Sequence, residues 1–94
     1  MLVRIVRMSF KEENVKEFIE IFNTSQPFIL AFEGCLDVKL YRDQSQNNVY
    51  YTKSIWIRHE ALEKYRNSEL FKTTWSKTKI LFDHRPQAFS LVGV

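Results

Sequence analysis

Short runs of apolar and β-branched residues alternate with polar segments along the chain, and this pattern predicts four β-strands. The predicted strands cover residues 2–9, 35–42, 49–57 and 87–94. The second strand alternates strictly, so Leu36, Val38 and Leu40 are expected to share one buried face. Because residues 43–48 form a polar turn, the second and third strands are expected to pair as an antiparallel hairpin.

The segment after the first strand has apolar residues at helical spacing and predicts a helix over residues 9–22. Its buried face is expected to consist of Val15, Phe18, Ile19 and Phe22. Ser9 and Glu12 have the spacing of a capping box, in which each side chain binds a free backbone amide at the helix start. Pro27 is expected to interrupt the helix or to open a further turn, and Gly34 to end the helical region in the left-handed conformation.

A second helical region follows the hairpin and is predicted in two parts, residues 59–66 and 68–82. Ser68 can cap the second part, and Pro86 ends it because a proline disfavours helical geometry at the residue before it. The apolar face of this second part is expected to consist of Leu70, Phe71, Thr74, Trp75, Thr78, Leu81 and Phe82.

The resulting order of elements, β-α-β-β-α-β, favours an α+β fold of the ferredoxin-like type, an antiparallel four-stranded sheet with helices on one face. A chain of 94 residues has room for one domain, so residues 1–94 are interpreted as a single domain. The helix-free face of the sheet still carries apolar side chains. A second copy packed against it, sheet on sheet, would bury them, so we expect a homodimer.

Charge narrows the functional classes only slightly. The formal net charge is +3, and the basic residues are dispersed without a stripe or a recognition motif, so nucleic-acid binding is not expected. Arg4 and Arg7 point to opposite faces of the first strand. One of the two could therefore reach an acidic substrate or the dimer partner.

The single cysteine and the N-terminal sequence bear on the compartment. Cys35 excludes an internal disulfide and fits a reducing cytoplasm. Arg4 and Arg7 break the apolar run at the N-terminus, so no signal peptide is predicted. No apolar segment approaches the ~20 residues of a membrane span. We therefore interpret the protein as cytoplasmic and without a membrane partner.

Three groups of residues resemble the antibiotic-biosynthesis monooxygenase family of dimeric α+β barrels. They are Glu33-Gly34-Cys35-Leu36 before and in the second strand, Tyr50-Tyr51 followed by Trp56 in the third, and Glu60-Ala61-Leu62, Tyr65 and Ser68-Glu69-Leu70-Phe71 in the helices that follow. The resemblance covers nearly the whole chain in order and implies the fold and the dimer. It also implies an activity, because oxygenase members oxidise electron-rich aromatics, such as quinols or anthrones, with molecular oxygen and without metal or flavin.

The first functional hypothesis is therefore a cofactor-independent monooxygenase that acts on a small aromatic or quinol-type substrate, with no metal. Trp56 and Tyr65 are the candidate catalytic residues: Trp56 would border the pocket or donate its indole N–H, and the Tyr65 phenol would donate to a substrate oxygen. The candidate substrate-binding residues are Tyr50, Thr52, Phe71 and Trp75. Strand alternation places Tyr50, Thr52, Ser54 and Trp56 on one face. The alternative role of Trp56, Phe71 and Trp75 is core packing, for which Phe71 is the strongest candidate, and the alternative for Tyr65 is a rim position with a buried ring and a solvated hydroxyl.

Two alternatives stay open. No residue stands out as a general base, which favours a non-catalytic dimeric domain that binds a small ligand. Haem-degrading members of the family use an asparagine, a tryptophan and a histidine at positions that correspond here to the vicinity of Val6, Tyr65 and Trp75, so this activity is less expected. His59 and His84 lack the spacing of a metal motif.

Overall fold

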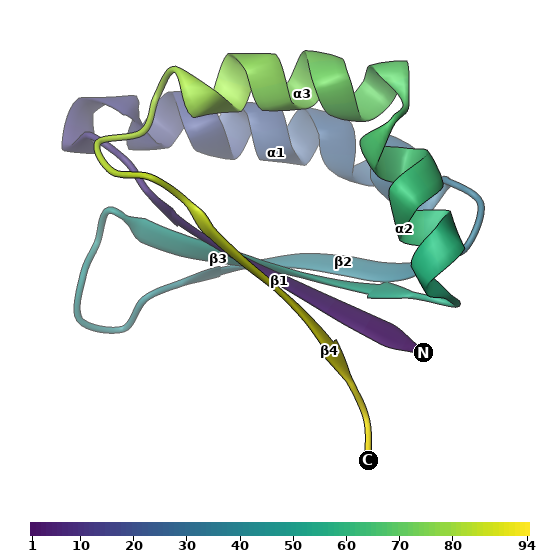
Figure 1. Cartoon of the computed structure of the whole chain (residues 1–94). Coiled ribbons are helices and arrows are strands. Elements are labelled where there is room, and N and C mark those ends of the chain that lie inside the picture. Colours follow the sequence, from purple (N-terminus) through teal and green to yellow (C-terminus); the bar gives the residue numbers. More distant parts are fainter.

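The structure consists of one sheet and one layer of helices, in the predicted order of elements. The computed structural model describes residues 1–94 and contains four strands, three α-helices and a short 3-10 helix (Figure 1). Their bounds are β1 Leu2–Ser9, η1 Glu12–Asn14, α1 Val15–Leu30, β2 Cys35–Arg42, β3 Val49–Trp56, α2 His59–Arg66, α3 Glu69–Lys79 and β4 Gln87–Val92. This confirms the ferredoxin-like α+β arrangement, including the division of the second helical region.

All neighbouring strands in the sheet are antiparallel, in the order β2-β3-β1-β4. Strands β3 and β1 are therefore central, and β2 and β4 are the edges. Leu2 lies opposite Trp56, and Arg4 lies opposite Ser54 and Ser90. Directly paired residues share a face, and Leu2 and Trp56 pack with Ala61 and Leu62 of α2, so all five belong to the face that the helices cover (Figure 1). We call this the helix-covered face and its reverse the open face.

A β-bulge at the start of β2 changes which of its residues are buried. Cys35 pairs with Trp56 and Asp37 with Ile55, so Leu36 is an extra residue without a partner. The side chain of Leu36 is 51% exposed, and the prediction that it is buried on one face with Val38 is wrong. A bulge shifts the alternation of faces by one residue, so Cys35 takes the place on the helix-covered face.

Helix α1 runs without a break from Val15 to Leu30, with Pro27 in its last turn. The predicted interruption at Pro27 is therefore wrong. A proline this close to the helix end removes one backbone hydrogen bond, and the carbonyl that loses its partner belongs to Asn23, which is exposed to water. Beyond the proline, the amide of Ala31 donates to the Pro27 carbonyl at 3.1 Å, so helical bonding continues.

The start of the first helical region also differs from the prediction. Ser9 is the last residue of β1, and Phe10 after it is fully buried and forms an isolated bridge with Phe82. The predicted capping box of Ser9 and Glu12 does not form, and neither η1 nor α1 has a side-chain hydrogen bond at its N-cap. Helix α3 ends at Lys79, short of the predicted end at residue 82, and Phe82 lies in the bridge instead of in the helix.

Two predicted features of the helix ends are confirmed. The hydroxyl oxygen of Ser68 accepts a hydrogen bond from the amide of Phe71 at 3.2 Å and caps α3. Gly34 has a φ of +86°, in the left-handed region that glycine tolerates. A Cβ atom at Gly34 would also collide with the Cβ of Ala61, so this glycine allows the start of β2 to approach α2 closely.

The core fills the space between the helix-covered face and the helices in two clusters. The larger consists of Met8, Phe10, Phe18, Phe22, Ile29, Val38, Tyr50 and Leu81, and the smaller of Leu2, Trp56, Ala61 and Leu62. No helix covers the open face (Figure 1). The apolar residues of this face that are not buried are Val3, Ile5, Tyr41, Tyr51, Ile55, Phe89 and Leu91. None of the helices combines the length and the apolar character needed to cross a membrane.

Candidate active site

A cavity of about 310 Å³ lies between the helix-covered face of the sheet and the helices. Strands β1 and β3 and the three α-helices contribute most of its wall. Thirteen of its 21 lining residues are hydrophobic. A predominantly apolar cavity with a few polar groups is the usual form of a small-molecule site, and this one suits an apolar ring.

Aromatic side chains form a continuous wall along this cavity. The rings of Trp56 and Tyr65 are stacked with their centroids 5.1 Å apart, and the rings of Tyr65 and Phe71 are nearly perpendicular with their centroids 5.3 Å apart. Trp75 then stacks on Phe71 at 5.8 Å with only 11° between the ring planes. We call these four residues the aromatic wall. The structure thus brings together four of the site residues predicted from the sequence, contributed by one strand and two helices.

Tyr65 contributes the phenol of the aromatic wall. Burial raises the pKa of this phenol to about 12, and the neighbouring thiol of Cys35 acts in the same direction. The phenol is therefore protonated at neutral pH. No hydrogen bond contributes to its pKa, and no buried side-chain atom of the protein lacks a partner, so its oxygen lies at an accessible position. Tyr65 is thus available as a neutral hydrogen-bond donor to a ligand.

Trp56 has a different character, because its polar atom is already engaged. The side chain has no exposed surface, and its indole N–H donates to the hydroxyl oxygen of Ser54 at 2.9 Å. This bond within β3 fixes the orientation of the indole against Tyr65. Of the two roles predicted for Trp56, the geometry therefore favours bordering the cavity over donating a hydrogen bond to a substrate.

The remaining predicted residues divide between cavity and core. Thr52 lines the cavity, as does Ser54 on the same face of β3. Tyr50 does not line it: the ring of Tyr50 packs in the larger core cluster, 5.7 Å from Phe18 and 6.2 Å from Phe10. Tyr50 lies on the predicted face of β3, so the alternation is confirmed, but Phe10 and Phe18 fill the space next to its ring.

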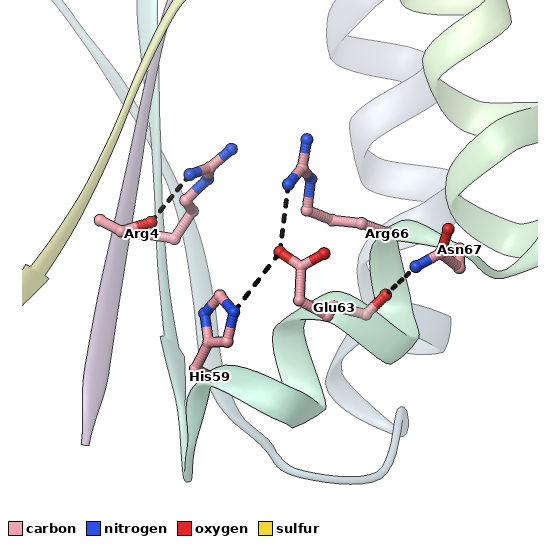
Figure 2. Close-up of polar contacts among 6 residues, drawn as sticks. Arg4, His59, Glu63, Arg66 and Asn67 are labelled. Carbon is pink, nitrogen blue, oxygen red and sulfur yellow. Dashed lines mark hydrogen bonds and ion pairs between the residues drawn. The ribbon is translucent and has the colours of Figure 1, made fainter.

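Two arginines also line the cavity, and only one was a candidate from the sequence. Arg4 extends from β1 and Arg66 from the last turn of α2, with both guanidinium groups pointing in the same direction (Figure 2). Of the two arginines of β1, Arg4 is thus the one on the cavity side. Arg66 follows the buried Leu62 by four residues, so helical spacing from Leu62 could have identified it.

Comparison with known families decides the assignment. The model of the antibiotic biosynthesis monooxygenase family matches residues 1–76. The chain belongs to this family. The resemblance found in the sequence is thereby confirmed, and the residues of the aromatic wall all lie within the matched segment. Among curated proteins, none matches this sequence at a significant level.

Solved structures of several other proteins share the fold. A putative antibiotic biosynthesis monooxygenase from Nitrosomonas europaea aligns with a TM-score of 0.92 at 12% identity, over 100% of this chain and 99% of that one. A conserved protein from Methanosarcina mazei aligns with a TM-score of 0.91 at 21% identity, over 97% and 91% of the two chains. SnoaB, a cofactor-independent oxygenase from Streptomyces nogalater, aligns with a TM-score of 0.87 at 16% identity, over 98% and 91%.

Histidine and cysteine lie outside the cavity of this antibiotic biosynthesis monooxygenase family member. The side chains of His59 and His84 are 65% and 76% exposed, and each lies near a neighbouring carboxylate. Burial raises the pKa of the Cys35 thiol, and its sulfur donates weakly to the Asp37 carbonyl at 3.6 Å. A thiol held protonated in this way is a poor nucleophile. No group of three or more His, Cys, Asp or Glu side chains is placed to hold a metal ion.

Proposed function

We propose that this family member is a cofactor-independent monooxygenase that oxidises a small aromatic or quinol-type substrate with molecular oxygen. The observation that carries the proposal is the aromatic wall, which encloses an apolar cavity and presents one neutral phenol, that of Tyr65. An apolar cavity admits both an aromatic ring and O₂. It also limits the access of bulk water to the reactive oxygen intermediates.

The proposed chemistry needs few protein groups, because the substrate supplies the electrons. For an anthrone-type substrate, loss of a proton from the ring methylene gives an anion whose carbon bonds to O₂. The peroxide anion so formed takes a proton back to become a hydroperoxide, which loses water to leave a ketone, so one oxygen atom enters the product and the other leaves as water. No carboxylate or imidazole lines the cavity, so we assign the departing proton to water.

Each predicted site residue has a role in this scheme. Tyr65 donates a hydrogen bond to the oxygen on which negative charge develops. Trp56 holds the ring of Tyr65, while Phe71 and Trp75 bind the flat face of the substrate and Thr52 adds a hydroxyl at the sheet. Tyr50 supports the neighbouring core and has no direct contact with the substrate.

A second candidate function is a non-catalytic domain that binds a small aromatic ligand. The absence of a carboxylate or a histidine among the lining residues favours it, since neither of the usual general bases is at hand. Both candidates share the rest of the proposal, namely a homodimer formed through the open face and a cytoplasmic location. The apolar residues of the open face support the homodimer, and the lone Cys35 supports the location.

Oxygen uptake with a panel of hydroquinones and anthrones, in metal-chelated buffer and corrected for the rate without protein, tests the proposal. We expect saturable uptake that falls about 10²-fold in kcat for Tyr65→Phe, the usual cost of removing one oxyanion donor. Tyr41→Phe removes a phenol from the open face and is the matched control, with unchanged uptake. Saturable tryptophan quenching by the same compounds without uptake would instead identify the ligand-binding domain.

A further inference from the structure

All charged side chains that line the cavity are positive. Among the 21 lining residues, Arg4 and Arg66 alone carry a charge at neutral pH, and none is Asp or Glu. Most of the other lining residues are hydrophobic. Two cations without an anion in the lining give the cavity a positive potential, which favours an anionic occupant.

Arg4 has no acidic partner in the protein. One of its guanidinium nitrogens, Nη1, donates to the hydroxyl oxygen of Ser90 at 2.8 Å, and Ser90 is neutral. None of the ion pairs in the structure includes Arg4. Burial lowers the pKa of Arg4, the charge of Arg66 lowers it further, and Glu63 opposes both. A guanidinium remains protonated despite such shifts, so the positive charge of Arg4 stays at the cavity.

The one carboxylate near the two arginines is shared. Oε1 of Glu63 lies 3.2 Å from Nη1 of Arg66 and 4.0 Å from Nε2 of His59 (Figure 2). Glu63 does not line the cavity, and its side chain is 40% exposed to solvent. It offsets one of the two arginine charges, which leaves a single positive charge in excess at the cavity.

We propose that the cavity accepts aromatic compounds that carry one carboxylate, with the carboxylate held between Arg4 and Arg66 and the ring against the aromatic wall. The N–H groups of a guanidinium form a fork that matches the two oxygens of a carboxylate. One negative charge balances the single excess positive charge, whereas a phosphate monoester would bring nearly two. The inference depends on the proposed function only in naming the compound a substrate, since binding alone requires no turnover.

Calorimetric titration with 2-naphthoate and 2-naphthamide tests this selectivity on the unmodified protein. The two probes have the same ring and nearly the same shape, and they differ in charge. We expect 2-naphthoate to bind at least about tenfold more tightly, because hydrogen bonds to an ionised group are markedly stronger than neutral ones. Equal affinities, or no saturable binding of 2-naphthoate, would overturn the proposal.

Two charge-removing variants and a matched control locate the effect. Arg4→Gln and Arg66→Gln should each weaken 2-naphthoate binding about tenfold or more and change 2-naphthamide binding less than twofold. Arg42→Gln removes the same charge from the exposed end of β2, outside the cavity lining, and should leave both affinities unchanged. Equal losses for both probes in the cavity variants, or an equal loss in Arg42→Gln, would contradict the proposal. If Arg4→Gln does not fold, Arg66→Gln alone provides the test. The Arg66 side chain is 43% exposed, so its replacement is expected to leave the fold intact.

Oxygen uptake separates this inference from the monooxygenase proposal. The matched substrates are 1,4-dihydroxynaphthalene-2-carboxylate and its methyl ester, which have the same quinol ring and differ in charge. A higher kcat/KM for the acid, lost in Arg4→Gln, supports both proposals. Equal kcat/KM values keep the monooxygenase and overturn the acid selectivity. Selective binding of 2-naphthoate without oxidation of either quinol keeps the selectivity and removes the monooxygenase.

Discussion

Tyr65 shows how position alone changes the chemistry of a side chain. Its ring is enclosed by Trp56 on one side and Phe71 on the other, and the loss of hydration disfavours the phenolate. The result is a phenol that remains a hydrogen-bond donor throughout the neutral and mildly alkaline range. The role proposed for it requires this property, because a phenolate could accept a proton but could not donate to an oxyanion.

The raised pKa of Tyr65 predicts a specific loss of stability in alkali. The phenol titrates near 10 in the unfolded chain and at about 12 in the folded one. Between these values the folded state binds more protons than the unfolded state, so the free energy of unfolding falls as pH rises, by up to about 1.4 kcal/mol per pH unit. Below pH 10 the phenol makes no such contribution.

Urea unfolding at intervals from pH 8 to pH 11.5 measures this loss. Wild type should lose stability more steeply above pH 10 than Tyr65→Phe, which has no phenol to titrate at this position. Tyr41→Phe controls for the removal of a tyrosine hydroxyl and should follow the wild-type curve. Parallel curves for wild type and Tyr65→Phe would show that burial does not hold the phenol in its neutral form.

At the scale of the elements, the approach of β2 to α2 determines where the aromatic wall stands. Gly34 precedes β2. Its carbonyl oxygen accepts a hydrogen bond of 2.8 Å from the amide of Ile57, which follows β3. A side chain at Gly34 would displace Ala61 and with it α2, the helix that carries Tyr65 and Arg66. Local backbone conformation and the geometry of the cavity are therefore coupled at this glycine.

Gly34→Ala is expected to destabilise the protein by more than about 1 kcal/mol. The left-handed conformation alone costs an L-residue roughly 1–2 kcal/mol, and the contact with Ala61 adds to it. Gly93→Ala is the matched control, because nothing lies near a Cβ at Gly93. Urea unfolding at one fixed protein concentration compares the two. Adding Ala61→Gly to Gly34→Ala should recover part of the loss, and a Gly34→Ala effect no larger than that of Gly93→Ala would refute the argument.

The elements that local pattern predicts correctly are those whose signals agree with each other. Residues 49–57 are rich in aromatic and β-branched residues and follow a polar turn, and both signals place the same strand, which the structure shows as Val49–Trp56. Pro27 and Leu36 were predicted wrongly because the deciding facts are not local. Pro27 is tolerated because it falls in the last turn of α1, and Leu36 is exposed because β2 contains a bulge.

The same distinction applies to the candidate site. Helical spacing and strand alternation are enough to place Trp56, Phe71 and Trp75 toward one interior. Alternation also puts Tyr50 on that face, but it cannot show that Phe10 and Phe18 occupy the space in front of it. The sequence patterns also could not show that Arg4 and Arg66 line the same cavity. That proximity depends on the register of β1 in the sheet and on the position of α2 above it.

For the molecule as a whole, the open face is unlike an ordinary solvated surface. Its β1 and β4 half carries four aliphatic or aromatic side chains in direct pairs, Val3 with Leu91 and Ile5 with Phe89. Phe89 and Leu91 are 49% and 51% exposed. The β2 and β3 half carries Lys39 opposite Lys53, which favours contact with water. The apolar half is thus the part of the open face best suited to meet a second copy.

A homodimer formed through the β1 and β4 half predicts a mass of about twice 11.3 kDa in light scattering at micromolar concentration. A two-fold interface presents each residue twice, so Phe89→Asp would bury two unpaired charges and should shift the protein to monomer. Ile80→Asp is the matched control. Ile80 is 72% exposed, lies just after α3 and belongs to no strand of the sheet, so this variant should remain dimeric. A wild-type monomer at working concentration would contradict the dimer. Dissociation by both variants would show that the contact lies elsewhere.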